Sequence, residues 1–304
     1  MNVPVLELDN LAKTYAGRRG GVRAVRGVSL SVGAGEVYGF LGPNGAGKST
    51  TIRMLLTLIR PTSGAARLFG RDVARDPGGL GRVGSLVDGG TFYPFLSGRA
   101  NLKVLARTQG LKDFARIGPL LEQVGLGRDG DRRVKGYSTG MRQRLGVAAA
   151  LLNQPELVIL DEPVNGLDAA GIGEMRALIR RLSAEEGRTV FLSSHLLNEV
   201  QQVCDRVAII DAGAVVREAT VADLLAQDDA VRIEAAPLER AAALLSPHRA
   251  VETVDGGLRV AARRAEIPDI VRLLVGDGVE VFSVAPETRS LESVFLSLTR
   301  DSHA

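Results

Sequence analysis

The sequence predicts an α/β fold with an inserted helical subdomain, followed by a smaller α+β domain. A helical pattern without a clear strand runs from about 97 to 153, which predicts the insertion. Beyond about 228 the order of elements changes, which predicts the second domain. The α/β class rests on short apolar runs that alternate with helical patterns, at residues 83–87, 157–160, 189–193 and 206–210.

The first domain opens with two strand signals. Apolar and polar residues alternate over 28–32, and the run 36–42 is typical of a more buried strand. A glycine-rich turn follows and leads into a helix from about Lys48 to Leu58. Because the later apolar runs keep alternating with helical patterns, we expect a mainly parallel sheet covered by helices.

We place the first domain at 1–228 and the second at 229–304. Patterns in the second domain follow the order β-α-β-β-α-β, which resembles a ferredoxin-like unit. Its strands are expected near 231–233, 251–254, 258–262 and 279–284, and its helices near 238–245 and 267–275. A last helix is expected to carry Leu291, Val294, Phe295 and Leu298.

The composition of the chain argues against several classes of function, including nucleic-acid binding and a membrane-spanning role. Lys and Arg total 38 against 35 Asp and Glu, and no arginine cluster is interleaved with aromatics, so nothing points to nucleic acid. Cys204 is the only cysteine, so no internal disulfide is possible and we expect a buried thiol. The N-terminus does not resemble a signal peptide, and no apolar run reaches the length of about eighteen residues that a membrane helix needs. A role at a membrane would require a partner.

The segment GPNGAGKST, residues 42–50, matches the pattern G-x-x-x-x-G-K-[ST] between a strand and a helix. Its glycines let backbone N–H groups close around phosphate, Lys48 can reach the β- and γ-phosphates, and the Ser49 hydroxyl can bind Mg²⁺. This predicts a P-loop NTPase core that binds a nucleotide with Mg²⁺. The nucleotide-binding residues would be Gly42, Pro43, Asn44, Gly45, Ala46, Gly47, Lys48, Ser49 and Thr50.

Two carboxylates end the buried apolar strand of LVILDEP, residues 157–163. Such acids are costly there unless they face a cation or a reacting water, although they could also cap a helix. With the phosphate loop present, we expect Asp161 in the Mg²⁺ shell and Glu162 as the general base. His195 ends the run LSSH at the edge of the sheet where ligands of α/β folds bind, and we expect it to be catalytic together with Glu162 and Lys48.

Over about residues 5–218 the chain resembles the nucleotide-binding subunits of ATP-binding-cassette (ABC) transporters. GPNGAGKST corresponds to the Walker A motif, YSTGM to the signature usually written LSGGQ, LVILDEP to Walker B and NGLD to the D-loop. His195 corresponds to the switch histidine. Tyr15 corresponds to the aromatic that stacks on adenine; the alternative is a strand residue packed under the sheet.

The resemblance implies an ATPase that works as a dimer. The signature, like the phosphate loop, begins a helix, so the chain carries two helix starts suited to phosphate. In the family, two subunits pack head to tail, and the signature of one grips the γ-phosphate held by the other. Ser138 and Gly140 would therefore bind the ATP held by Lys48 of the partner subunit, with a homodimer as the expected form.

One position departs from the family pattern. The Q-loop glutamine should fall in VGSLVDGG, and Asp88 stands there instead. A carboxylate could approach Mg²⁺ directly or through water, so Asp88 joins Ser49 and Asp161 as a metal-site candidate. The alternative is a turn aspartate before two glycines. The acidic residue, the variant signature and the added domain resemble the bacitracin and daunorubicin exporter branch.

The stretch TFYPFLSG concentrates aromatic residues in a chain that is only 4% aromatic. Pro94 interrupts regular structure between Tyr93 and Phe95, so these rings and that of Phe92 cannot all share one face. We expect some of them to be exposed and the region Asp88–Ser97 to contact a membrane permease. The alternative is that all three rings fill the joint between the sheet and the helical subdomain.

Other ATPase classes fit less well. A DNA-repair or chromosome ATPase of this family needs a long coiled coil between Walker A and the signature, and the short span here shows no sustained heptads. Translation-associated members carry two cassettes, and a monomeric kinase or GTPase has no use for the signature. We therefore expect the ATPase subunit of an exporter, held by its permease at the cytoplasmic face of the cell membrane. The transport path then belongs to the permease.

Overall fold

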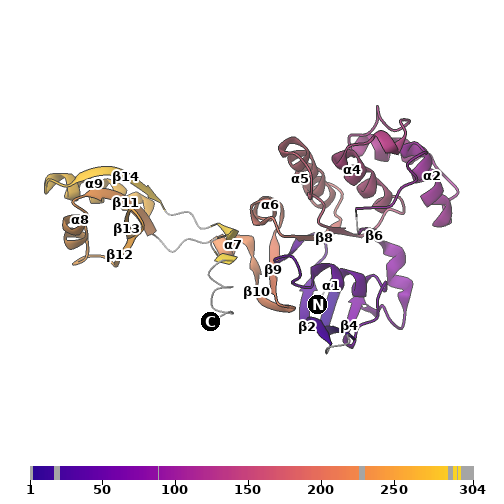
Figure 1. Ribbon diagram of the computed structural model, residues 1–304, viewed down its shortest axis with the longest axis horizontal. Coiled ribbons are helices and arrows are strands. Elements are labelled where there is room, and N and C mark those ends of the chain that lie inside the picture. The colour runs from indigo at the N-terminus through magenta and orange to yellow at the C-terminus, as the bar shows by residue number, and fades with distance from the viewer. Residues whose placement is uncertain are drawn as a thin grey trace. The chain divides into compact units, whose positions relative to one another are not determined.

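The computed structural model describes residues 3–16, 21–87, 89–225, 230–286, 290–292 and 294–295 (Figure 1). The chain divides into a first compact unit, Met1–Val221 with Phe295–Ala304, and a second, Ala222–Val294. None of the helices in these described ranges combines the length and apolar character needed to cross a bilayer.

A six-stranded sheet forms the centre of the first unit, in the order β10-β9-β3-β8-β7-β6. All its neighbouring strands are parallel except β10, which pairs antiparallel with β9. Helices on its faces explain the continuous apolar runs, because strands buried on both faces do not alternate. The strands are β3 (Val37–Leu41), β6 (Val83–Leu86), β7 (Leu157–Asp161), β8 (Thr189–Ser194), β9 (Arg206–Asp211) and β10 (Ala214–Thr220).

A second sheet of the first unit is antiparallel, with the order β2-β1-β4-β5. The strand expected at 28–32 belongs to this sheet as part of β2, which pairs with β1; the sequence patterns predicted a mainly parallel sheet and did not reveal this antiparallel one. Register shifts between β1 and β2 disturb the alternation that would have revealed the pairing. The strands are β1 (Leu6–Tyr15), β2 (Val22–Val32), β4 (Ser63–Leu68) and β5 (Arg71–Asp72), followed by a 3-10 turn at Pro77–Arg82.

Helix α1 (Lys48–Leu55) lies between the two sheets and contributes Ile52, Met54 and Leu55 to their shared core. It ends before the expected Leu58 because Thr57 adopts a left-handed conformation, with φ of 59°. Three other helices contact the parallel sheet, namely α4 (Thr139–Ala150), α5 (Ala169–Ala184) and α6 (Leu197–Val203), and the short α7 (Val221–Leu225) follows β10.

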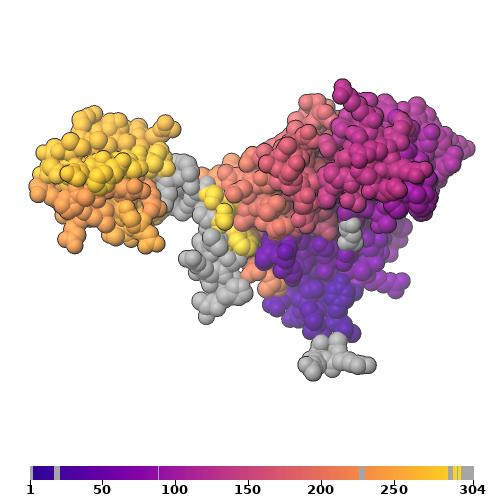
Figure 2. Space-filling model, turned by 45° about the horizontal axis from the view of Figure 1, so that its top comes forward, coloured from indigo at the N-terminus to yellow at the C-terminus, as the bar shows by residue number. Residues whose placement is uncertain are grey.

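The expected helical subdomain comprises α2 (Gly98–Thr108), α3 (Ile117–Gln123) and α4 (Thr139–Ala150), with a 3-10 turn at Val134–Gly136. These helices pack on one another and form one lobe of the first unit, seen as the magenta atoms in Figure 2. Serine side chains cap the N-termini of two of these helices, α2 and α4. Ser97 accepts a hydrogen bond from the Ala100 N–H at the start of α2, and Ser138 accepts one from the Met141 N–H at the start of α4.

The second unit has its own sheet, in the order β12-β13-β11-β14, with a separate apolar core that includes Val231, Ile233 and Leu258. Its described elements run β-α-β-β-α-β. They are β11 (Ala230–Ala236), α8 (Leu238–Leu245), β12 (Val251–Val254), β13 (Gly257–Ala261), the 3-10 turn Arg264–Glu266, α9 (Ile267–Gly276) and β14 (Glu280–Pro286). Leu298, expected on a last helix, lies outside the described residues.

Candidate functional site

The phosphate loop connects β3 to α1 and has a backbone that only glycine can adopt at its last position. Gly47 has φ of 103°, and a Cβ there would lie 2.5 Å from the Ala24 carbonyl oxygen. Gly45 also has a positive φ, of 85°. Because Gly47 immediately precedes α1 and carries no side chain, the N–H groups of the first helical turn are accessible to an anionic ligand.

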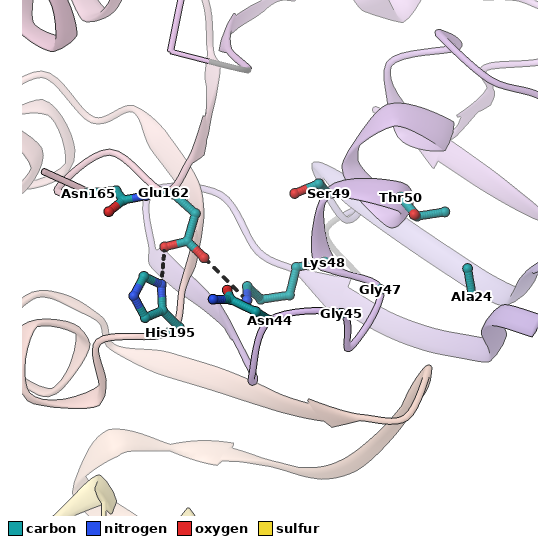
Figure 3. A pocket seen from close by; sticks show the side chains of 10 residues that line it. All are labelled: Ala24, Asn44, Gly45, Gly47, Lys48, Ser49, Thr50, Glu162, Asn165 and His195. Atoms are coloured by element: carbon teal, nitrogen blue, oxygen red, sulfur yellow. Dashed lines mark hydrogen bonds and ion pairs between the residues drawn. The ribbon is translucent and has the colours of Figure 1, made fainter.

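A pocket of about 320 Å³ lies over this loop, as Figure 3 shows. Strand order explains its composition, because β8 lies between β3 and β7 and all three end at the same edge. The loop after β3, the residues after β7 and the residue after β8 therefore meet there. The lining residues are Ala24, Asn44, Gly45, Gly47, Lys48, Ser49, Thr50, Glu162, Asn165 and His195.

One carboxylate in this pocket joins the other two charged or titratable side chains. Glu162 Oε1 lies 3.2 Å from Lys48 Nζ, and Glu162 Oε2 lies 2.8 Å from His195 Nδ1 (Figure 3). The Lys48 side chain is only 5% exposed, and its ammonium also donates to the carbonyl oxygens of Gly42 and Pro43, at 2.8 and 3.2 Å. The sequence-predicted catalytic residues Lys48, Glu162 and His195 are thus brought together.

Asp161 is not among the residues that line the pocket. It ends β7 and is only 8% exposed, and its Oδ1 accepts a hydrogen bond from the Ser193 hydroxyl at 2.5 Å. Ser193 is paired with Asp161 in the parallel register of β7 and β8. The next residue, Glu162, has a left-handed backbone with φ of 50°, which is strained for a non-glycine residue.

Tyr15 ends β1 and is 38% exposed, with Lys13 Nζ 5.2 Å from the centre of its ring. It is therefore not packed under the sheet, which was the alternative to adenine stacking. It does not belong to the lining of the described pocket, so an adenine on its ring would extend beyond that pocket.

The signature residues Ser138 and Gly140 begin α4 and do not line the described pocket either. They lie beside the D-loop of their own chain. A Cβ on Gly140 would meet Leu167 Cδ2 at 3.4 Å, and one on Gly166 would meet Thr139 Cγ2 at 3.3 Å. The chain therefore presents two separate helix starts, as the sequence indicated, and only that of α1 faces this pocket.

A groove of about 250 Å³ is lined by residues of β6 and of the helices α2 and α4, and Phe92, Leu86 and Gly146 are among its lining residues. Tyr93 and Phe95 are 53% and 64% exposed, with ring centres 5.7 Å apart. The alternative in which all three aromatic rings fill the joint is thus wrong for two of them. Asp88 lies outside the described residues.

The site fits a nucleoside triphosphate with its cation. The loop supplies backbone N–H groups and a buried ammonium for phosphate oxygens. Ser49 and Thr50 carry hydroxyls and line the pocket, and Asp161 ends β7, directly before the lining residue Glu162. Mg²⁺ prefers such oxygen ligands and keeps several of its waters, so a sparse set of protein ligands suits it.

Sequence reasoning missed three residues of this site, of which Ala24 lines the pocket from β2. Asn165 lines the pocket, and Ser193 contacts both acidic residues at the end of β7. Asn165 belongs to the NGLD motif, which was itself a signal. Ser193 stands in LSSH directly before the sheet edge, but its partners depend on the pairing of β7 with β8.

Comparison with known proteins gives consistent matches. A family model described as "ABC transporter" matches residues 25–165. The bacitracin transport ATP-binding protein BcrA of Bacillus licheniformis is 38% identical over 97% of this chain and 97% of its own. The daunorubicin/doxorubicin resistance ATP-binding protein DrrA of Streptomyces peucetius is 38% identical over 97% of this chain and 92% of its own.

The fold also matches a solved structure, a dimeric ATP-binding cassette in a post-hydrolysis state bound to ADP and phosphate. The match has a TM-score of 0.65 at 24% sequence identity and covers 71% of this chain and 98% of the solved one. Likeness at this identity supports the fold of the first unit.

Proposed function

Because the chain belongs to the family of ABC transporter ATP-binding proteins, we propose that it is the ATP-hydrolysing subunit of an export-type ABC transporter. The observation that carries the proposal is the Glu162 carboxylate, which bridges Lys48 and His195 at the mouth of the phosphate loop. In this proposal residues 1–228 form the ATP-binding domain and 229–304 an accessory domain.

Each of these side chains has a distinct role in hydrolysis. Lys48 neutralises charge on the β- and γ-phosphate oxygens of ATP, within the cradle of N–H groups at residues 42–50. Glu162 takes a proton from the water that attacks the γ-phosphorus, and His195 Nδ1 holds the carboxylate in position for this. Ser49 and Asp161 would hold Mg²⁺, and the bound ion would supply positive charge to the phosphate oxygens. Asp88 is the third candidate for the Mg²⁺ shell.

The working form in this proposal is a head-to-tail dimer. The relatives named for bacitracin and daunorubicin support export, and the structurally similar cassette is dimeric. Ser138 and Gly140 stand at a helix start that lies outside the described pocket of their own chain. In the dimer they bind the γ-phosphate that the partner's Lys48 holds, and Tyr15 stacks on the adenine.

The membrane permease docks at the groove between β6 and the helical subdomain. The exposed rings of Tyr93 and Phe95 stand beside the groove residue Phe92, and apolar rings of this kind anchor protein interfaces. This docking holds the subunit at the cytoplasmic face of the membrane. A double alanine variant of Tyr93 and Phe95 should still bind ATP but no longer co-purify with the permease. Normal co-purification would refute this docking surface.

Asp88 is tested by two substitutions. Asp88→Gln restores the residue usual in the family and should retain ATP turnover, whereas Asp88→Ala should slow turnover and weaken its dependence on Mg²⁺. An alanine variant with unchanged turnover and Mg²⁺ requirement would assign Asp88 to the turn alone.

The experiment that tests the whole proposal measures the rate of ATP hydrolysis by the Glu162→Gln variant. Loss of a general base typically costs about 10²- to 10⁴-fold in rate, and the variant should still bind MgATP and accumulate as a closed dimer in size-exclusion chromatography. Ser138→Phe on the same background should bind ATP as a monomer. Wild-type turnover by Glu162→Gln would overturn the assignment.

A further inference from the structure

Ser193 is a single buried side chain that contacts both acidic residues at the end of β7. Its hydroxyl donates to Asp161 Oδ1 at 2.5 Å and accepts from the backbone N–H of Glu162 at 3.0 Å. It is fully buried, with an exposed fraction of 0%. The parallel pairing of β7 with β8 places it directly opposite Asp161.

The bond to Asp161 fixes one of the two carboxylate oxygens. A carboxylate that is 8% exposed needs a donor, because burial without one is costly. A hydroxyl that donates to a carboxylate makes a charge-assisted hydrogen bond, which is stronger than one between neutral groups. With Oδ1 occupied by Ser193, the orientation of Oδ2 is also set, and metal-binding carboxylates depend on outer partners that orient them in this way.

The bond to Glu162 acts on the backbone from which the general base projects. The Glu162 N–H points at Ser193 and has two acceptors there, the carbonyl oxygen at 3.2 Å and the hydroxyl oxygen at 3.0 Å. Glu162 keeps a φ of 50°, a conformation that persists only when its surroundings hold it. In that conformation its carboxylate lies close to both Lys48 and His195.

We propose that Ser193 is a positioning residue for ATP hydrolysis, whose hydroxyl orients the Asp161 carboxylate and holds the Glu162 backbone in its catalytic conformation. The inference rests on the roles that the proposed function gives to Asp161 and Glu162. One hydroxyl thereby holds both the proposed Mg²⁺ ligand Asp161 and the proposed general base Glu162. Without it, the Glu162 N–H keeps the Ser193 carbonyl, so the strand pairing survives while the orientation of both acids loosens.

The adjacent Ser194 provides a matched control. It is also buried, at 1% exposure, and stands at the same end of β8. Its hydroxyl accepts from the Leu196 N–H at 3.0 Å, toward the start of α6 and not from an acidic residue at the end of β7. Removing either hydroxyl costs one buried hydrogen-bonding group, but only Ser193 contacts Asp161 and Glu162.

The test compares Ser193→Ala, Ser193→Cys and Ser194→Ala in the full-length chain. Metal affinity is measured by electron paramagnetic resonance with Mn²⁺ as the probe, in the presence of a non-hydrolysable ATP analogue. Ser193→Ala should weaken Mn²⁺ binding and lower kcat, each by about 10- to 100-fold, as losses of outer metal-site partners do. In the absence of metal, the affinity of Ser193→Ala for the ATP analogue should stay within about twofold of the affinity of Ser194→Ala.

Ser193→Cys keeps the side-chain size but offers a weaker donor, so its kcat and Mn²⁺ affinity should fall between those of wild type and Ser193→Ala. Thermal unfolding of all three variants checks the fold, with expected shifts of about 2–4 °C for one lost hydrogen bond. If Ser193→Cys and Ser193→Ala matched Ser194→Ala in kcat and Mn²⁺ affinity while Glu162→Gln was inactive, this inference would be wrong and the proposed function would stand. If Glu162→Gln also turned over normally, the proposed function itself would fail.

Discussion

Two clusters of charged side chains occupy opposite ends of the parallel sheet. At the end where β3 and β9 begin, Arg206 joins Glu36 and Glu218, with Nη1 at 3.1 Å from Glu36 Oε1 and Nη2 at 2.7 Å from Glu218 Oε1. The Tyr38 hydroxyl donates to Glu218 at 2.8 Å. At the other end, where β3, β7 and β8 finish, Glu162 joins Lys48 and His195.

The two clusters differ in what surrounds them rather than in composition. The Arg206 cluster links three strands, β3, β9 and β10, through pairs that are complete within the chain. The Glu162 cluster lines a pocket of about 320 Å³ and stands on a strained backbone next to a helix start. A partly buried charge cluster by itself therefore does not mark a site; open space and backbone N–H groups beside it do.

The largest expected difference between the two clusters is the effect of removing Lys48 on nucleotide affinity. Lys48→Ala deletes charge-assisted contacts to phosphate, so affinity for a fluorescent ATP analogue should fall on the order of 100-fold. Glu218→Gln, at the other end of the sheet, serves as the control and should bind the analogue as the wild type does. Equal loss in both variants would mean that the contrast between the clusters is false.

Tyr15 is expected to contribute to nucleotide affinity at the Glu162 end of the sheet. Stacking of a base on an aromatic ring is worth about 1–3 kcal/mol, so Tyr15→Ala should weaken ATP binding by about 5- to 150-fold. Tyr15→Phe keeps the ring face and should change affinity little. Equilibrium titration with both variants checks this, and equal damage from the two would assign the effect to the hydroxyl.

Arg206→Ala should have the opposite effect to Lys48→Ala: it should lower the stability of the fold and leave the affinity for nucleotide unchanged. It leaves Glu36 and Glu218, which are 16% and 28% exposed, without their shared cation. We expect the free energy of unfolding to fall by about 1–3 kcal/mol in denaturant titrations, with ATP affinity unchanged. A variant of wild-type stability and weakened ATP binding would reverse the roles of the two clusters.

The smallest effect concerns alkaline pH. Burial, and next the nearby Glu218 carboxylate, raise the pKa of the Tyr38 phenol well above its ordinary value of 10. The folded state then keeps a proton that the unfolded state loses, so this contribution is complete below about pH 10 and declines above it. Tyr38→Phe should therefore show a shallower loss of unfolding free energy between about pH 9 and about pH 11. Identical slopes for the variant and the wild type would contradict this.

Local motifs account for what the sequence predicted well. The phosphate loop, Glu162 and the signature helix are each set by contiguous residues, and a glycine such as Gly47 is required by the backbone itself. The parallel strands were also visible as continuous apolar runs, because both of their faces are buried.

What sequence reasoning missed depends on pairing between distant segments. Ser193 meets Asp161 only because β8 lies beside β7, and Tyr38 meets Glu218 only through the order β10-β9-β3. The antiparallel sheet was overlooked because β1 and β2 pair through register shifts that break the period of two. Strand order is a property of the whole fold, and no local pattern encodes it.

The central claim is that the pocket at the Glu162 end is half of a site, completed by the signature of a second copy. Disulfide cross-linking tests it directly, since the single native thiol, Cys204, is buried and can be replaced by serine. On a Cys204→Ser, Glu162→Gln background, one chain carries Asn44→Cys and a differently tagged chain carries Ser138→Cys. Mild oxidation should join the two kinds of chain only when MgATP is present. Absence of that mixed dimer under MgATP, or equal cross-linking with and without ATP, would contradict the claim.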